Sequence, residues 1–248
     1  MSTVFLSPSL QEFNPYVTGN GSEADFMNRL ADEMIPGLLL NGVSLSRSDR
    51  DGSVTDAIRK SNAYSPDLHV SLHSNASPEG MDGRMQGPEI YYYKDSTEGL
   101  RAAELIAAQL AQVYPFGDTV TLIPTDDELA ELKRTKAPAV FVEVAYHDNP
   151  ADAAWIESSL PQIANAINRG IADYFEIPFS DTDGARVGRV TIENGTLNLR
   201  AAPGTNAPVI GALENGEIVV ILRRVPGWVQ VLTEDGTGYA ADRYITQL

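Results

Sequence analysis

The sequence contains no cysteine, few histidines and fewer basic than acidic residues. Without cysteine there are no disulfides, thiolate metal sites or cysteine nucleophiles, so any metal must be held by histidine, carboxylate or neutral oxygen ligands. The formal charge of −16 argues against nucleic acid and anionic membranes as partners, because both attract clustered lysine and arginine. No apolar run approaches the ~18 residues of a membrane-spanning helix.

The N-terminal segment "MSTVFLSPS" lacks the basic and apolar regions of a secretory signal. We therefore expect a protein that is synthesised in the cytoplasm and that leaves it only through lysis or another release route. The sequence does not indicate an oligomeric state.

The composition that is present, 43% hydrophobic and 21% charged residues, is typical of a globular protein with a substantial core. Residues 186–248 contain six acidic residues and six arginines, so the whole net charge lies in residues 1–185. The polar segment "EIPFSDTDGAR" lies where the acidic part of the sequence gives way to the neutral part, and its glycine and proline are typical of a linker. We predict a first domain over residues 1–178, a linker over 179–186 and a second domain over 187–248.

Strand and helix patterns alternate in the first domain. A helix is predicted over residues 22–40, with Ser22 as its N-cap and Asp25 in the capping-box position. Strands are predicted at residues 4–6, 43–47, 67–73, 89–93, 120–124 and 139–145, and further helices at 54–63, 98–114 and 150–175. The alternation predicts an α/β fold with a mixed central sheet flanked by helices. In the second domain, short β-rich segments at residues 197–200, 217–222, 228–232 and 238–245 predict a small all-β barrel.

Two of the three histidines, His69 and His73, lie on one predicted strand. Their spacing places both side chains on the same face but roughly 13 Å apart, so they cannot bind one ion. His73 lies where the strand gives way to the loop "SNASPEG", at the edge where α/β sheets bind ligands. His69 lies at the opposite end of the strand and is predicted to be structural.

Two glutamates, like His73, lie near the ends of predicted strands or helices. Glu143 is the one carboxylate in the apolar strand "AVFVEVA", and burying it is costly unless it is paired or functional. An internal ion pair or exposure at the strand end would also explain it. Glu23 follows the Gly-rich loop "TGNGS" and opens the first helix, where the helix dipole alone favours an acid.

Five motifs occur in a characteristic order: "LSPS", "GSEADFMNRLAD", "AIRKSNAYSPDLHVSLHSNA", "GPEIYYY" and "LKRTKAPAVFVEVAYHDNPADAAWI". With these motifs, residues 3–175 resemble the zinc-dependent N-acetylmuramoyl-L-alanine amidases of the type 3 family. The resemblance implies that Glu23 and His73 are zinc ligands and that Glu143 is the general base. Asn75, in the Ser-apolar-His-x-Asn pattern of the third motif, and His147 are predicted to bind substrate.

The sequence departs from the family at the first zinc histidine, which lies in the loop after the first strand. That loop reads "SPSLQEFN" here, and Gln11 is the nearest polar residue in register, with Glu12 and Asn14 as neighbours. A glutamine amide oxygen can coordinate zinc, but it is neutral, so the affinity should fall. His147, four residues after Glu143, is an alternative ligand, although it could equally orient substrate or cap the loop. We favour Gln11.

The second domain resembles a bacterial SH3-like (SH3b) domain over "TLNLRAAPGTNAPVIGALENGEIVVIL" and "GWVQVLTEDGTGYAADRYI". Such modules accompany wall hydrolases, so the resemblance implies a peptidoglycan-binding role. Trp228 and Tyr239 are candidate groove aromatics, although a tryptophan in a small barrel more commonly packs in the core.

These resemblances predict a peptidoglycan hydrolase that cleaves the amide bond between N-acetylmuramic acid and L-alanine with zinc-activated water. The alternative is a catalytically impaired relative that binds peptidoglycan without cleaving it. The missing histidine favours this alternative, whereas the retention of Glu23, His73 and Glu143 opposes it. A phage lysin and a mother-cell autolysin would share the chemistry, and the sequence does not choose between them.

Overall fold

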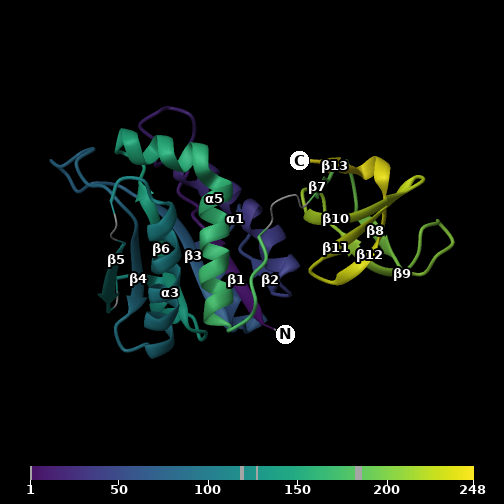
Figure 1. Ribbon diagram of the computed structural model, residues 1–248, viewed down its shortest axis with the longest axis horizontal. Helices are drawn as coiled ribbons and strands as arrows, with labels where there is room; N and C mark the ends of the chain where they lie inside the picture. Colours follow the sequence, from purple (N-terminus) through teal and green to yellow (C-terminus); the bar gives the residue numbers. More distant parts are fainter. Residues whose placement is uncertain (1, 118–119, 127, 182–185) are drawn as a thin grey trace. The chain divides into compact units, whose positions relative to one another are not determined.

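The computed structural model describes residues 2–117, 120–126, 128–181 and 186–248 (Figure 1). These form two compact units. The first unit is built from the chain up to Met34 and from Val43–Phe179, and the second from Ile35–Gly42 and Ser180–Leu248. Within the described ranges, no helix combines the length and the apolar character needed to cross a membrane.

The first unit contains a six-stranded sheet in the order β2-β1-β3-β6-β4-β5. Its strands are β1 (Thr3–Pro8), β2 (Ser44–Arg47), β3 (Leu68–Asn75), β4 (Glu89–Tyr93), β5 (Thr121–Thr125) and β6 (Ala139–Tyr146). β1, β2, β3 and β6 pair in parallel, β4 runs antiparallel to β6, and β5 is parallel to β4. The predicted mixed sheet is therefore confirmed.

The helices that accompany this sheet along the chain are α1 (Glu23–Leu40), α2 (Val54–Tyr64), α3 (Thr97–Val113), α4 (Ala130–Arg134) and α5 (Pro150–Tyr174). The predicted capping box of α1 is present, because the Asp25 amide donates to Ser22 Oγ (3.2 Å) and the Ser22 amide donates to Asp25 Oδ2 (3.1 Å). The sequence pattern predicts no element at α4, which is too short to show helical periodicity.

Helices α3 and α5 lie side by side over the sheet (Figure 1). Gly170 of α5 allows their close approach, since a Cβ atom at that position would lie 2.6 Å from the Ile106 Cα of α3. The two backbones therefore meet at a point where any side chain would force them apart.

Side chains of β3 alternate between a polar and an apolar face. His69, Ser71 and His73 project to one side, while Val70 and Leu72 project to the other, and all five are buried. The polar row begins in the interior of the first unit with His69 and reaches the carboxyl edge of the sheet with His73.

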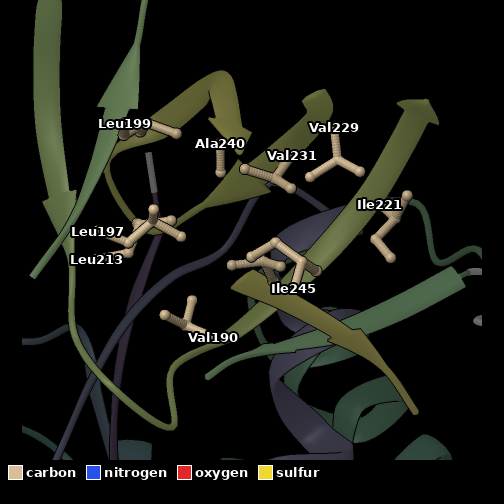
Figure 2. Packing of buried hydrophobic residues seen from close by; sticks show 10 residues of the cluster. Val190, Leu197, Leu199, Leu213, Ile221, Val229, Val231, Ala240 and Ile245 are labelled. Carbon is tan, nitrogen blue, oxygen red and sulfur yellow. The ribbon is translucent and has the colours of Figure 1, made fainter. Parts of the chain in front are cut away.

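The second unit contains an entirely antiparallel seven-stranded sheet in the order β13-β7-β10-β11-β12-β8-β9. Its elements are β7 (Arg186–Val190), β8 (Leu197–Arg200), β9 (Val209–Leu213), β10 (Ile218–Val225), β11 (Trp228–Thr233), β12 (Gly236–Ala241), the 3₁₀-helix η1 (Asp242–Tyr244) and β13 (Ile245–Gln247). The core is formed by aliphatic side chains such as Leu199, Val231 and Ile245 (Figure 2). The expected all-β domain is confirmed, although β7 and β9 were not predicted.

Candidate metal and catalytic site

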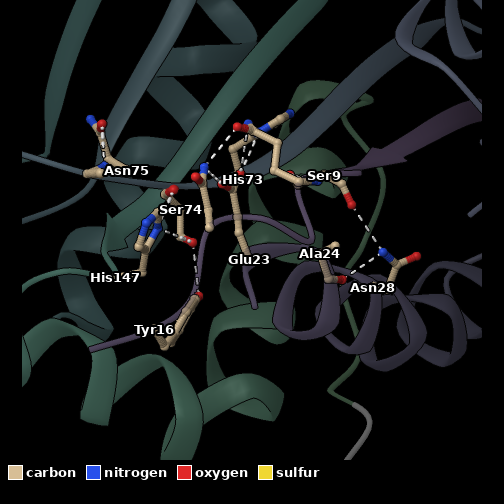
Figure 3. Close-up of polar contacts among 12 residues, drawn as sticks. Ser9, Tyr16, Glu23, Ala24, Asn28, His73, Ser74, Asn75 and His147 are labelled. Atoms are coloured by element: carbon tan, nitrogen blue, oxygen red, sulfur yellow. Dashed lines mark hydrogen bonds and ion pairs between the residues drawn. The ribbon is translucent and has the colours of Figure 1, made fainter. Parts of the chain in front are cut away.

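Glu23 and His73 meet at the carboxyl edge of the sheet (Figure 3). Glu23 is the first residue of α1 and His73 lies near the end of β3, and both are buried. His73 Nδ1 lies 2.8 Å from Glu23 Oε1. Burial opposes ionisation of Glu23, but hydrogen bonds with His73 and Asn14 outweigh it and hold the Glu23 pKa below its ordinary value.

The pKa of His73 shifts in the complementary direction. Burial disfavours the charged imidazolium, but the hydrogen bond with Glu23 and the carboxylates of Glu143 and Glu131 outweigh this and raise the His73 pKa. Glu23 and His73 thus form a charge-assisted pair in the metal-free protein.

Gln11 reaches this pair from the loop after β1. Its Nε2 atom lies 3.4 Å from both Glu23 Oε1 and His73 Nδ1. Asn14 orients Gln11, because Asn14 Nδ2 donates to Gln11 Oε1 (2.8 Å) and to Glu23 Oε2 (3.0 Å). The structure therefore brings together Gln11, Glu23 and His73, whereas their role as ligands stays a prediction.

These three side chains offer donor types that zinc binds, although His73 Nδ1 and Glu23 Oε1, 2.8 Å apart, lie at hydrogen-bond distance and would have to separate to bind one ion. Zinc binds imidazole nitrogen and carboxylate or neutral oxygen at about 2.0–2.2 Å, which separates tetrahedral ligand atoms by roughly 3.3 Å. The Gln11 amide nitrogen occupies such a position, and half a turn of the amide would exchange it for the oxygen. Among the residues described, no three His, Cys, Asp or Glu side chains gather in a metal-binding group.

Glu143 of β6 is the register partner of His73 on β3. Its Oε2 atom is buried and has no hydrogen-bond partner within the described part of the chain. Burial raises the pKa of Glu143 to about 8; His73 opposes this shift, while Glu23 and Glu89 add to it. A buried carboxyl group with a free oxygen and a pKa near neutral can accept and return a proton.

His147 lies in a separate buried cluster. Its Nδ1 atom is 2.8 Å from the Ser74 carbonyl oxygen and 3.1 Å from Ser74 Oγ, which also accepts a hydrogen bond from the Tyr16 hydroxyl (3.0 Å). The Tyr16 ring stacks on His147. None of the hydrogen bonds found for described residues connects His147 to Glu23 or His73. These contacts suit the loop-capping alternative, and the substrate-binding role stays a prediction.

The Asn75 side chain also forms hydrogen bonds within the protein. Its Nδ2 atom donates to Glu89 Oε2 (3.0 Å) and its Oδ1 atom accepts from the Ala76 amide (2.8 Å). Glu89, at the start of β4, received no role from the sequence. The available signal was its position as a single carboxylate preceding the tyrosines of "EIYYY".

His69 lies outside the metal site, as its position in the strand predicts. Its Nδ1 atom is 2.9 Å from Ser61 Oγ of α2, and its Nε2 atom is 3.2 Å from Glu131 Oε1 of α4. All three side chains are buried. They connect two helices to β3 beneath the site.

The second unit carries a cavity of about 690 Å³ lined by Trp228, Tyr244, Arg200 and Arg243 among others. Trp228 is partly exposed and does not belong to the hydrophobic core of this unit. Tyr239, the other predicted groove aromatic, does not line the cavity; its hydroxyl accepts a hydrogen bond from Arg223 (3.0 Å). The cavity combines aromatic surface with two guanidinium groups and the Glu193 carboxylate.

Comparison with known proteins places these sites in context. A family model described as N-acetylmuramoyl-L-alanine amidase matches residues 13–173, and one described as bacterial SH3 domain matches residues 195–246. An endolysin of Bacillus phage SPP1 is 32% identical over 142 residues, covering 54% of this chain and 50% of the relative. The amidase LytC of Bacillus subtilis is 28% identical over 183 residues, covering 70% of this chain and 35% of the relative. The chain thus spans half or less of these two relatives.

Solved structures resemble the first unit. The N-acetylmuramoyl-L-alanine amidase of Clostridium difficile 630 aligns with a TM-score of 0.62 and 22% identity, covering 71% of this chain and 97% of that one. The amidase AmiC2 of Nostoc punctiforme aligns with a TM-score of 0.61 and 21% identity, with the same coverage. At this identity the alignments establish a common fold.

Proposed function

Because this chain belongs to the N-acetylmuramoyl-L-alanine amidase family, we propose that it hydrolyses the amide bond between N-acetylmuramic acid and the L-alanine of the peptidoglycan stem peptide. The observation that carries the proposal is the convergence of Glu23 and His73, 2.8 Å apart, beside Glu143 with its free buried oxygen. This arrangement would provide metal ligands from the start of α1 and from β3, and a proton acceptor on the neighbouring strand β6.

The family is generally zinc-dependent. Glu23 and His73, with Gln11 as the neutral third ligand, would hold the zinc ion, which when bound polarises the scissile carbonyl and lowers the pKa of water. Asn14 would support the site through Glu23, because Asn14 Nδ2 donates to Glu23 Oε2 (3.0 Å).

Glu143 would act as the general base and then as the general acid. Its unpartnered Oε2 atom would take the proton of the attacking water and return it to the leaving amine of L-alanine. A pKa raised to about 8 favours the protonated form at neutral pH, and a zinc ion bound beside Glu143 would favour the carboxylate form that the first transfer needs. Such a group contributes roughly 10²–10⁴-fold to the rate.

The second unit would hold the enzyme on its substrate. Its residues are close to neutral overall, whereas the first unit carries the acidic excess and is poorly suited to attraction by anionic wall polymers. The cavity beside Trp228 would accommodate part of the peptidoglycan. The protein would reach the wall after release by lysis or another route.

The deciding experiment compares wild-type protein with Glu143→Gln on purified peptidoglycan. New stem-peptide amino termini should appear with wild type and fall by at least ~100-fold with Glu143→Gln, while both proteins sediment equally with the wall. Wall binding by wild-type protein without stem-peptide release would instead establish the impaired, non-cleaving alternative.

Metal content provides the second test. Plasma mass spectrometry should find about one zinc per chain in wild-type protein. The zinc should be lost in His73→Ala and in Gln11→Ala but retained in His147→Ala. Retention in Gln11→Ala together with loss in His147→Ala would reassign the third ligand to His147.

A further inference from the structure

Glu89 and Glu143 face each other on neighbouring strands. They are register partners in the antiparallel β4–β6 pair. Side chains directly opposite in such a pair come within about 4.5–5.5 Å at Cβ, and like charges there destabilise the sheet. A second carboxylate beside the proposed catalytic base therefore costs stability, which suggests a function other than support of the fold.

The two carboxylates differ in their hydrogen bonding. Glu89 Oε2 accepts from Asn75 Nδ2 (3.0 Å) and from the Tyr91 hydroxyl (2.7 Å), and its Oε1 atom accepts from the Tyr146 hydroxyl (2.8 Å). Glu143 Oε2, in contrast, is buried without a partner within the described residues. Both carboxylate oxygens of Glu89 thus accept hydrogen bonds from the protein, whereas Oε2 of Glu143 accepts none from the described residues.

Two of the residues that donate to Glu89, Asn75 and Tyr146, lie just beyond an irregularity in the sheet. His73 pairs with Glu143, and the next recorded pair is Asn75 with Tyr146, so β6 contains one more residue than β3 between the two pairs. Such a bulge interrupts the hydrogen-bond ladder and redirects side chains. Asn75 and Tyr146 bind the two different oxygens of Glu89, so one carboxylate from β4 ties β3 to β6 just beyond the bulge.

We propose that Glu89 is a positioning residue: by bridging Asn75 and Tyr146 across the β3–β6 bulge, it fixes the placement of Glu143 relative to His73. This inference rests on the proposed amidase function, because the placement matters for proton transfer to the reacting water and amine. Glu89 itself need not contact the substrate.

The activity test uses three variants and a soluble muropeptide substrate, a disaccharide carrying the stem peptide. Glu89→Gln keeps the shape, and its amide can still accept from Asn75 and Tyr91 and donate to the Tyr146 hydroxyl. It should retain kcat within about 10-fold, whereas Glu89→Ala should lose at least ~100-fold, as for a misplaced catalytic group. KM should change less than about threefold in both. Tyr93→Phe, on the same strand but outside these hydrogen bonds, is the matched control and should match wild type.

Three outcomes would overturn the proposal. A rise in KM at constant kcat would make Glu89 a substrate-binding residue. An equal loss of kcat in Glu89→Gln and Glu89→Ala would show that the charge acts, not the bridge. Wild-type kcat in Glu89→Ala would show that neither matters. If Glu89→Ala does not fold, Tyr146→Phe removes one arm of the bridge and should lower kcat by about 10-fold.

A second readout does not depend on activity. The His147 amide donates to the Asn75 carbonyl oxygen (2.8 Å) at the bridged end of these strands, while the His69 amide donates to the Pro138 carbonyl oxygen (2.9 Å) at the other end. Glu89→Ala should speed hydrogen exchange at His147 at least ~10-fold and leave His69 unchanged. Unchanged exchange at His147 would refute the bridge even if wild-type protein proves inactive, so the two proposals can fail separately.

Discussion

His69 and Glu131 meet in the interior of the first unit, with His69 Nε2 3.2 Å from Glu131 Oε1 and both side chains buried. Ser71 Oγ lies 3.1 Å from the same nitrogen, and the Phe5 ring stacks on the imidazole. The pair joins the short helix α4, which precedes the strand bearing Glu143, to β3, which bears His73. We therefore expect the interaction between His69 and Glu131 to stabilise the part of the sheet that carries His73 and Glu143.

Removing one partner of this pair should destabilise the protein more than removing both. His69→Phe and Glu131→Leu should each lower the free energy of unfolding by about 3–5 kcal/mol, because each leaves the other buried side chain without its ion-pair partner. The double variant should lose clearly less than the sum. Urea unfolding of the wild type, the two single variants and the double variant measures this double-mutant cycle. The control is Glu128→Leu, at an exposed position, whose free energy of unfolding should stay within ~0.5 kcal/mol of wild type. Strict additivity would show that the pair is not coupled.

Glu131 should also make stability depend on acid. Burial opposes its ionisation, but His69 and Ser7 outweigh this and lower the Glu131 pKa. A carboxyl group with a lowered folded-state pKa contributes stability above its unfolded pKa of about 4.3, and this contribution is lost as the pH falls through the folded-state pKa. Unfolding free energy measured below about pH 4.5 should fall more steeply for wild type than for Glu131→Gln. Parallel curves would contradict the assignment.

Gln11→His should strengthen zinc binding. The substitution would replace a neutral amide with an imidazole where the Gln11 side chain lies 3.4 Å from His73 Nδ1 and Glu23 Oε1. We expect roughly a 10-fold gain in affinity, ~1.4 kcal/mol, in a competition titration against a chromogenic chelator. Exposed Gln112→His on α3 controls for an added surface histidine. An unchanged affinity for Gln11→His would show that the Gln11 side chain does not reach the metal.

Trp228→Ala should weaken wall binding without unfolding the second unit. Trp228 lines the cavity and lies outside the hydrophobic core, so truncation removes contact area for a ligand but little packing. Buried tryptophans at interfaces often contribute about 2 kcal/mol, which corresponds to roughly 30-fold in the wall-binding constant. Leu222→Ala, exposed and outside the cavity, is the comparison. Equal sedimentation of both variants would place the wall-binding surface elsewhere.

Much of the first unit could be predicted because its signals are local. The helix over residues 22–40 was predicted from hydrophobic periodicity and the Ser22–Asp25 capping box, and β3 and β6 from their apolar runs. Glu23, His73 and Glu143 were singled out by their positions at element ends. The convergence of His73 and Glu143 could be anticipated because parallel strands end at one edge of the sheet, whereas Glu23 joined the predicted site only through the family resemblance.

The remaining features depend on contacts between distant segments. Glu131 lies in a five-residue helix without periodicity, and its partner His69 is 62 residues earlier in the chain. The function inferred for Glu89 depends on the β3–β6 bulge and on the register of β4, neither of which leaves a sequence pattern. The strands β7 and β9 each carry a glycine at their centre, Gly188 and Gly211, which weakens a strand pattern.

The strand order has a consequence for the timing of assembly. β6 is the last strand of the first unit to be synthesised, yet it lies between β3 and β4 in the sheet. A nascent chain can pair β1, β2 and β3, or β4 and β5, but it cannot join the two groups before β6 arrives. Non-local pairing of this kind forms slowly. We expect Glu143 to join Gln11, Glu23 and His73 only when the insertion of β6 completes the sheet.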